Sequence, residues 1–589
     1  MKDLIIDREN ILDLLSEEKT YTTPRETYSP FYSNIGLILD ENSTGIDALW
    51  LHYNRFSRPL WNKLIDIPAA FNKKRSRVEE IVFGFGQAKL AFYGTDRFLF
   101  SANGIASAGL FRGPAGQTGE RWRTRCDEKT ILIQGYSANG DARDPDRDVC
   151  FLTGVRALKG ALAADGTDIS AYCDADGDLL LAFAFECLTI DEQRLLQKLA
   201  NCPETVEEAA GMCAKHLRDC VSEFSITVNT ETERRMLAKA LHGLLFNLTK
   251  APGDLSKHVS SYPNRGEYPT HFLWDTCFQN LAYELMNGEL VKDFLLQFNA
   301  NQRSDGKYPQ FLCSTWARPA ETQPALIGWA VTRFAKSRKD EVFLSTMLAS
   351  LEKNNGWWLS ARMTSCGLVS CPHGLETGQD DSPRFDDGGT LAADMNSYLL
   401  HQMRCTAELA RRLGEEEKAA FWEKKAEALS EAMLSVLYCG DDNLFYDVSL
   451  STGAFIKIVS PVSLLPLWAG VSLPENRSRD MIERYLLDPK SMFGDVPFPS
   501  VAYDQESYQA EHWWRGPTWL PEAWLMLETL DKFGYVKEKQ MAQRRLYEML
   551  LKDVSMHELF NSQTGEGLGS EEQGWTCAIF IKLCKLLNG

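Results

Sequence analysis

The hydrophobic residues in the first third of the chain occur in short runs that end at turn-forming residues. Between about Tyr32 and Glu186, apolar runs alternate with clusters of Gly, Asn and Asp. The clearest runs are residues 81–94, 97–104, 129–144 and 176–186. Because runs of this length between such turns are typical of antiparallel strands, residues 1–190 are predicted to form a β-sandwich domain.

From Asp191 onward the apolar residues recur at helical spacing. Residues 191–228 hold two amphipathic segments and are predicted to be a helical linker. Residues 229–589 alternate helical stretches with long loops rich in aromatic residues, Gly and Pro. Twelve helices are predicted, near residues 231–249, 274–287, 290–301, 323–337, 341–363, 391–413, 416–438, 461–470, 475–487, 518–533, 536–553 and 571–588.

Twelve consecutive helices can pair into six helical hairpins. Two concentric rings built from these hairpins would form an (α/α)6 barrel over residues 229–589, with the loops at one end free to carry a site. The predicted fold class is therefore multidomain α+β, with the β-sandwich, the linker and the barrel in that order. No repeat at a fixed period indicates a solenoid.

The charge of the chain is acidic and spread out. There are 63 Lys and Arg against 81 Asp and Glu, a formal charge of −18, and no basic cluster of the kind that nucleic acid or an anionic membrane requires. No apolar stretch approaches the ~18 residues of a membrane span, and the first ten residues lack a signal-peptide run. We expect neither partner and predict a cytoplasmic protein; the sequence does not indicate an oligomeric state.

The fifteen cysteines are scattered without a CxxC pair or a short Cys/His spacing, so they are best explained as buried thiols in a reducing compartment. Zinc needs four converging ligands, which this spacing does not offer. The acidic residues 174–178 resemble the start of a calcium loop, but Phe185 stands where the bidentate Glu belongs, which favours a turn between strands. No cofactor or metal is predicted; a structural calcium ion in the acidic loops is left open.

Aromatic residues and carboxylates gather in the loops of the helical region, where 12 of the 15 Trp lie. Four segments combine them: residues 267–284, 374–389, 492–527 and 556–576. Each has a plainer explanation. Asp275 could cap a helix, residues 374–389 could be a solvated acidic loop, and Glu558 could be exposed.

Taken together, the four segments suit a sugar site. Two carboxyl groups, from the second and fourth segments, would lie among indole walls on which a polyhydroxylated ring can stack. One carboxylic acid would protonate a leaving oxygen while the other, as carboxylate, activates water. Distance along the sequence says nothing of distance in space, so only a barrel that brings its loops to one rim would make these groups neighbours.

The same segments resemble glycoside hydrolase family 63, which includes processing α-glucosidase I and the mannosylglycerate and glucosylglycerate hydrolases. The resembling segments are HFLWDTCF, GQDDSPRFD followed by DMNSYL, PSV with WWRGPTW, and HELFN with GWT. They occur in the expected order over about residues 230–589. The resemblance implies an (α/α)6 barrel that hydrolyses α-glycosidic bonds with inversion.

The resemblance also implies roles for individual residues. The general acid of the family falls on Asp380 and its general base on Glu558. Many members have Asn after the acid, whereas this chain has Asp381, which could raise the pKa of its neighbour or exchange roles with it. The predicted substrate-binding residues are Trp274, Asp275, Gln323, Asp381, Arg384, Trp514, Arg515, Gly516, Trp519 and Trp575. For Gln323, a role as a helix-initiating residue before Pro324 is an alternative.

The leading hypothesis is therefore an inverting, exo-acting α-glycosidase that removes an α-linked hexose, in the first place glucose, from a small oligosaccharide or glycoside. One alternative is an inverting disaccharide phosphorylase, which would need only the acid because phosphate replaces water and its base. The other is a catalytically silent carbohydrate-binding protein that keeps the aromatic pocket.

Overall fold

The structure is a computed structural model, and it describes residues 4–16, 190–251, 253–313 and 321–589, together with the strands between residues 25 and 187 and part of the turns that join them. Contacts between residues divide the chain into two compact units. The first is residues 1–271 with 285–287 and 313–316, and the second is residues 272–284, 288–312 and 317–589. The predicted domain boundaries are not tested by this division and stay a prediction.

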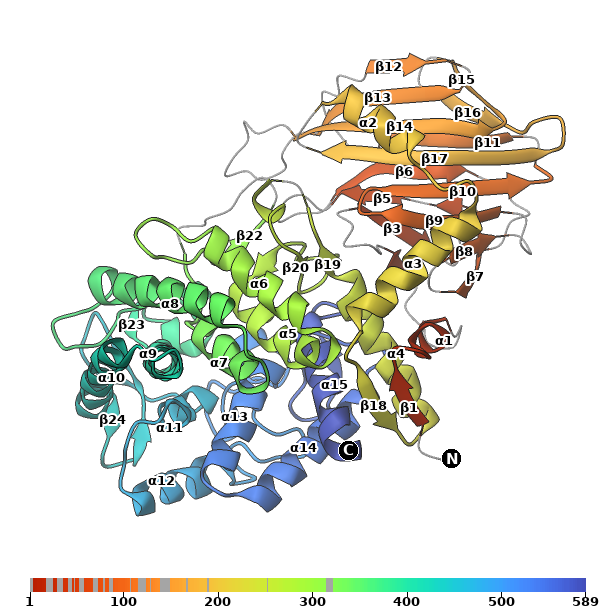
Figure 1. The fold of residues 1–589 in the computed structure, drawn as a ribbon. Helices are drawn as coiled ribbons and strands as arrows, with labels where there is room; N and C mark the ends of the chain where they lie inside the picture. The colour runs from red at the N-terminus through yellow and green to blue at the C-terminus, as the bar shows by residue number, and fades with distance from the viewer. Residues whose placement is uncertain are drawn as a thin grey trace. The chain divides into compact units, whose positions relative to one another are not determined.

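The first unit is built on two antiparallel sheets of eight strands each (Figure 1). One sheet has the order β12 (Arg123–Cys126), β13 (Thr130–Ser137), β14 (Val149–Lys159), β17 (Asp178–Cys187), β10 (Arg97–Asn103), β9 (Ala88–Gly94), β8 (Glu80–Phe83) and β7 (Lys73–Arg77). The other has the order β15 (Ala161–Asp165), β16 (Asp168–Tyr172), β11 (Ser107–Pro114), β6 (Arg58–Asp66), β5 (Ala48–Leu51), β3 (Ile35–Asp40) and β2 (Arg25–Tyr28), with β4 (Gly45–Ile46) beside β6. Each predicted run contains strand, and residues 81–94 form two strands rather than one. Residues 138–144 of the run 129–144 lie outside the described residues.

The predicted linker helices cover a face of the first of these sheets. Helices α2 (Glu192–Ala200) and α3 (Val206–Cys220) bury Leu195, Leu199 and Val206 in one apolar cluster with residues of β9, β10, β14 and β17. Side chains of Asp191 and Thr205 cap the two helices by accepting backbone N–H groups. The segment is therefore part of the core of the first unit as well as a connection along the chain.

A tight turn joins β16 to β17, as predicted for the acidic residues 174–178. Gly177 N donates to the backbone oxygen of Asp174 over 3.0 Å, and Asp178 N donates to the Asp174 side chain over 2.9 Å. Gly177 has a φ of +81°, a conformation that glycine adopts without strain. The remainder of the first unit includes α1 (Ile11–Leu15), α4 (Glu231–Phe246) and the pair β1 (Leu4–Asp7) with β18 (Ser225–Val228).

Each of the twelve helical segments predicted from the sequence contains a helix. After α4, these are α5 (Leu273–Met286), α6 (Gly288–Ala300), α7 (Ile327–Ser337), α8 (Glu341–Ala361), α9 (Ala393–Arg412), α10 (Glu416–Val436), α11 (Leu465–Ala469), α12 (Glu475–Met481), α13 (Leu520–Lys532), α14 (Val536–Leu550) and α15 (Gly574–Asn588). No helix of the described chain is long and apolar enough to span a membrane.

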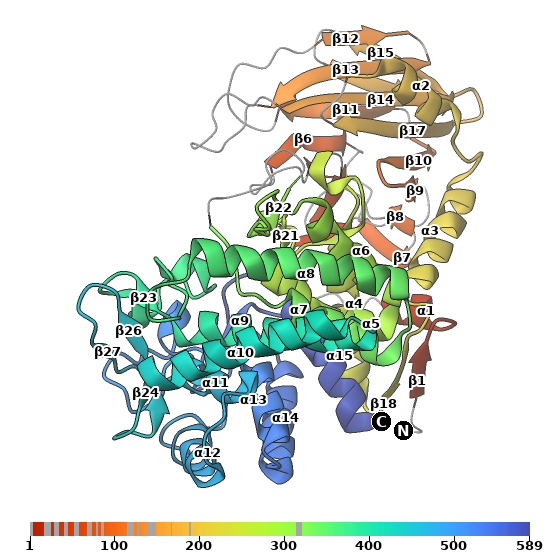
Figure 2. The ribbon, with the colours of Figure 1, turned by 60° about the vertical axis from the view of Figure 1, so that its left-hand side comes forward.

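In the second unit, every other helix belongs to a closed ring. Helix α5 packs on α7, α7 on α9, α9 on α11, α11 on α13 and α13 on α15, and α15 meets α5 again where Gly574 lies against Gln279. Figure 2 shows α8 and α10 lying alongside α9. Because each ring helix is followed by a helix that returns the chain, the ring helices start at one rim, and the loops before them gather there.

Candidate active site

Five of the six ring helices begin at segments that carry predicted site residues. Trp274 and Asp275 lie in the first turn of α5, and Gln323 lies just before α7. The acidic segment precedes α9, the predicted residues between Trp514 and Trp519 precede α13, and Trp575 opens α15. The fold thus brings together residues that are up to about 300 positions apart in the sequence.

Glu558 is held by the hairpin before α15, in which β28 (Leu559–Phe560) pairs with β29 (Gly567–Leu568). Its side chain is only 4% exposed, and Oε2 accepts hydrogen bonds from Ser570 N at 3.1 Å and Ser570 Oγ at 3.0 Å. Gly569, with a φ of +76°, leaves room for this carboxylate, because a Cβ there would lie 2.9 Å from Oε2. Two donors on one oxygen fix the orientation of the carboxylate.

Asp275 is a second buried carboxyl at the same rim and is 4% exposed. Burial raises the pKa of Asp275 well above its usual range, and the charge of nearby Glu558 raises it further. The two groups differ in their surroundings: Glu558 accepts two hydrogen bonds from Ser570, whereas burial of Asp275 favours its protonated form.

Four indoles form a continuous cluster around these carboxyls. Trp514 and Trp519 stack in parallel with ring centroids 3.8 Å apart, and Trp274 lies 6.0 Å from Trp514. Trp575 contacts both Trp274 and Trp519 at about 6 Å and donates Nε1–H to the backbone oxygen of Glu558 at 2.9 Å. All four indoles are no more than 4% exposed, so in the structure they pack on one another and on the elements that carry the two carboxyls.

Gln323 acts on this cluster through the backbone. Its Oε1 accepts a hydrogen bond from Trp274 N at 3.0 Å, and both residues are 4% exposed. This bond satisfies one of the free N–H groups at the start of α5. In the structure Gln323 therefore positions Trp274.

Asp380 and Asp381 differ in their surroundings. Asp380 is exposed and lies on the wall of an open cavity of about 890 Å³. Asp381 lines the same cavity, but its Oδ1 accepts a hydrogen bond from Trp514 N at 3.0 Å and its Oδ2 lies 3.2 Å from His512 Nδ1. Asp381 thus connects the acidic segment to the aromatic one.

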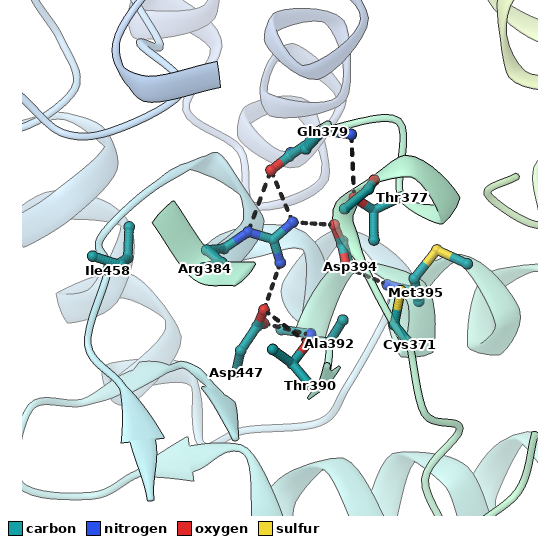
Figure 3. Close-up of polar contacts among 12 residues, drawn as sticks. Cys371, Thr377, Gln379, Arg384, Thr390, Ala392, Asp394, Met395, Asp447 and Ile458 are labelled. Carbon is teal, nitrogen blue, oxygen red and sulfur yellow. Dashed lines mark hydrogen bonds and ion pairs between the residues drawn. The ribbon is translucent and has the colours of Figure 1, made fainter. Parts of the chain in front are cut away.

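Behind Asp380, a buried network centres on Arg384 (Figure 3). Its Nη1 contacts Asp447 Oδ2 at 2.7 Å, and its Nη2 contacts Asp394 Oδ2 at 2.6 Å and Gln379 Oε1 at 2.8 Å. Gln379 also donates its Nε2–H to Glu522 of α13. All five side chains belong to residues no more than 2% exposed.

Within this network, the guanidinium of Arg384 binds groups of the protein itself. Its guanidinium is fully committed to acceptors inside the protein and is not part of the cavity wall. The acceptors come from α9, from β26 (Asp447–Ser449) and from the acidic segment itself. In the structure Arg384 holds this segment, and its predicted contact with substrate stays a prediction.

Burial shapes the protonation of the network. It raises the pKa of Glu522 to about 8, the charge of Asp394 raises it too, and Arg384 and the bond from Gln379 oppose the shift. Burial also raises the pKa of Asp447, although Arg384 opposes the change. No partner for Glu522 Oε2 is found among the described residues, which fits a protonated oxygen there.

Arg515 and Gly516 hold the aromatic segment in place. Arg515 pairs with Asp386 through both terminal nitrogens, at 2.5 and 3.1 Å, so it ties the aromatic segment to the acidic one. At Gly516 the backbone approaches Gln509 so closely that a Cβ would lie 2.2 Å from the Gln509 carbonyl oxygen. Both residues fix the wall, and neither lines the cavity.

Several residues of the site were not predicted from the sequence. Asp394 stands inside the DMNSYL segment, and Glu522 is an isolated carboxyl in the apolar start of a helix, a signal that could have identified it. Ser570 and Asp447 carry no signal, because only the fold brings them to Glu558 and Arg384. In the described part of the chain, no group of three His, Cys, Asp or Glu residues could hold a metal ion.

Paired carboxyl groups and an indole cluster at the rim of a helical ring define a site of the glycoside hydrolase class. Residues 268–576, just over half of the chain, match the family described as the mannosylglycerate hydrolase MGH1-like glycoside hydrolase domain. The chain belongs to this family and is a glycoside hydrolase.

Several curated relatives agree with this family, and a solved structure shares the fold. A mannosylglycerate hydrolase, MGH1, of Selaginella moellendorffii is 25% identical over 54% of this chain and 81% of that protein. A mannosylglycerate hydrolase of Rubrobacter radiotolerans is 29% identical over 35% of this chain, and the match spans about half, 47%, of that protein. The GH63 mannosylglycerate hydrolase of Thermus thermophilus, solved with Tris and D-glycerate, has a TM-score of 0.54 at 19% identity and covers 59% of this chain and 99% of its own. This last match shows a shared fold.

Proposed function

We propose that this protein is an inverting, exo-acting α-glycosidase that removes an α-linked hexose, in the first place glucose, from a small saccharide or glycoside. The ring of helices, with the intervening helices outside it, is the inner layer of an (α/α)6 barrel in this proposal, and the two eight-stranded sheets form the N-terminal β-sandwich. The cytoplasmic location likewise remains a prediction from the sequence.

One observation carries the proposal. The hairpin that holds Glu558 also holds Asn561, which lines the same cavity as Asp380. Asp380 on the cavity wall and the hairpin that carries Glu558 therefore belong to neighbouring parts of the rim, which supports pairing the two carboxyls in one reaction. In the proposed reaction, Asp380 donates its proton to the glycosidic oxygen, while Glu558 accepts a proton from the water that attacks the anomeric carbon from the other face.

The remaining side chains have supporting roles in this reaction. The indole cluster stacks on the hexose, and Asp275, in its protonated form, donates a hydrogen bond to a hexose hydroxyl. Gln323 and Ser570 orient Trp274 and Glu558. No step requires a metal ion or a cofactor.

The test is the anomeric form of the product together with Glu558→Ala. With an α-glucoside as substrate, proton NMR should show β-glucose first, and the variant should lose activity by about 10²–10⁴-fold. Azide should restore part of that activity by forming a β-glycosyl azide, since this anion needs no base. Release of α-glucose, or near-normal turnover of the variant, would refute the proposal.

The same assay tests the two alternatives. A rate that depends on phosphate and yields a glycosyl phosphate would identify a phosphorylase. Binding of sugars by calorimetry without any product would identify a silent binding protein.

A further inference from the structure

The cavity beside Asp380 is the space in which the leaving group of the proposed reaction would lie. Its volume of about 890 Å³ falls within the ~300–1,000 Å³ range of small-molecule sites. A general acid lies next to the oxygen that departs, so the groups lining the outer side of Asp380 contact the aglycone. This inference rests on the proposed function and concerns which aglycone the cavity accepts.

Uncharged hydrogen-bonding groups make up much of the wall. Gln509, Gln563 and Thr564 offer amide and hydroxyl groups that can donate and accept. The Asn561 amide also lines the wall, and it already donates to Glu511 and accepts from two backbone N–H groups. Such groups match the hydroxyls of a sugar or polyol.

Trp513 adds a flat apolar surface to this wall. It is half-buried, lines the cavity and lies edge-on to Trp519 at 5.5 Å. Its φ of +38° is unusual for a bulky residue, and such strain is typical of functional sites. A ring face held in this way suits stacking against a sugar.

The charges on the wall are mostly negative. Besides Asp380, they come from Asp381 and from Glu511, whose Oε1 accepts a hydrogen bond from Asn561 Nδ2 at 3.0 Å. Among the described lining residues the single candidate cation is His512, which is already paired with Asp381.

Two guanidinium groups that the structure describes near this wall do not change the balance. Arg515 is bound through two nitrogens to Asp386, and Arg384 lies in the buried network. A carboxylate entering the cavity would lose water and meet two carboxylates without a free cation on the described wall.

We propose that the aglycone of this enzyme is an uncharged polyhydroxy group, a sugar ring or a polyol, rather than a carboxylate such as glycerate. The amides, the hydroxyl and the Trp513 ring bind its hydroxyls and its apolar face, while Asp381 and Glu511 accept hydrogen bonds from it and repel anions. The chain would thus share its reaction with the mannosylglycerate hydrolases that it resembles but differ from them in the leaving group.

A matched pair of substrates tests this proposal. In 2-O-α-glucosylglycerol and 2-O-α-glucosylglycerate the glucosyl bond is the same, and a hydroxymethyl group replaces the carboxylate. At pH 7 and low salt, kcat/KM should be about tenfold or more higher for the glycerol compound. Equal or better hydrolysis of the glycerate compound would overturn the proposal.

Two variants refine the result. Glu511→Gln keeps an acceptor for Asn561 but removes a negative charge. It should therefore raise kcat/KM for the glycerate compound, so that the ratio of kcat/KM between the glycerol and glycerate compounds falls about threefold. Trp513→Ala should raise KM for the glycerol compound more than it lowers kcat. An unchanged preference in Glu511→Gln would contradict the electrostatic cause.

An aryl α-glucoside separates this proposal from the proposed function. If the aryl compound is cleaved but neither glucosylglycerol nor glucosylglycerate is, the two are compared as inhibitors of aryl glucoside cleavage. Tighter inhibition by the glycerate compound overturns the proposal. If the aryl compound is not cleaved, the glycosidase proposal fails; calorimetric binding of the pair then decides the charge preference by the same criterion.

Discussion

Residues 377–387 present one side to the ion network around Arg384 and the other side to the open cavity. On the inner side, Gln379 and Arg384 are 2% exposed and bonded only to other protein groups. On the outer side, Asp380 and Asp386 are exposed. Two residues that are adjacent in sequence, Gln379 and Asp380, therefore lie in surroundings of very different polarity.

The difference shows how a segment crowded with acids can serve a reaction. The inner side uses charge to fix the backbone, since a buried guanidinium binds its acceptors with strong directional preference. The outer side places the Asp380 carboxyl on the cavity wall. In the proposed reaction, the rigid inner side would hold this carboxyl in position.

The largest expected effect separates the two adjacent aspartates on the outer side. Asp380→Asn should lower kcat on an alkyl α-glucoside by about 10²–10⁴-fold, because the amide cannot donate a proton to the leaving oxygen in the same way. Asp381→Asn, the matched control, should lose tenfold or less, since its amide oxygen can still accept from Trp514 N. A reversal of these losses would assign the acid to Asp381.

The inner and outer ion pairs should differ in what they contribute to stability. Arg384→Ala leaves buried carboxylates without their cation and should lower the free energy of unfolding by about 3–5 kcal/mol. Arg515→Ala breaks the exposed pair with Asp386 and should cost about 1 kcal/mol or less. Denaturant unfolding monitored by circular dichroism measures both.

Equal losses in these two variants would contradict the distinction between the two sides. If Arg384→Ala does not fold, Arg384→Lys provides the comparison. Lysine retains the charge but not the geometry of the guanidinium. Arg384→Lys should therefore lower the free energy of unfolding by more than Arg515→Ala does. A smaller loss than in Arg515→Ala would show that the shape of the guanidinium is unimportant.

A smaller effect concerns pH. In the folded protein Glu522 keeps its proton up to about pH 8, whereas an unfolded Glu loses it near 4.3. Between these values the folded state binds more protons, so the free energy of unfolding falls as the pH rises, by at most about 1.4 kcal/mol per unit. Glu522→Gln removes this contribution, and its unfolding free energy should fall less than that of the wild-type protein between pH 5 and 8. Parallel curves would show that Glu522 is ionised when folded.

Much of the fold could be predicted from the sequence because its signals are local. Helical spacing located all twelve helices, and turn residues located the strand runs. That α2 and α3 pack on a sheet could not be predicted, since an amphipathic helix does not specify which surface it will cover. The closed ring depends likewise on contacts between distant helices.

The site was predictable to a lesser degree. Trp514, Trp519 and Trp575 could be proposed because tryptophans in polar loops are unusual. The position of Arg384 could not, because a charged residue inside an acidic segment looks exposed until Asp394 and Asp447 arrive from other elements. The catalytic roles of Asp380 and Glu558 stay predictions.

The stacked pair of Trp514 and Trp519 gives this protein an optical signal of its own. Two indoles 3.8 Å apart and within 6° of parallel are close enough for their electronic transitions to couple. Near-ultraviolet circular dichroism should therefore contain a contribution from this pair, alongside those of the other tryptophans. Both indoles are 2% exposed, so a ligand would change this contribution by moving one ring relative to the other. Occupancy could then be followed in the unlabelled protein, including variants that no longer turn over substrate.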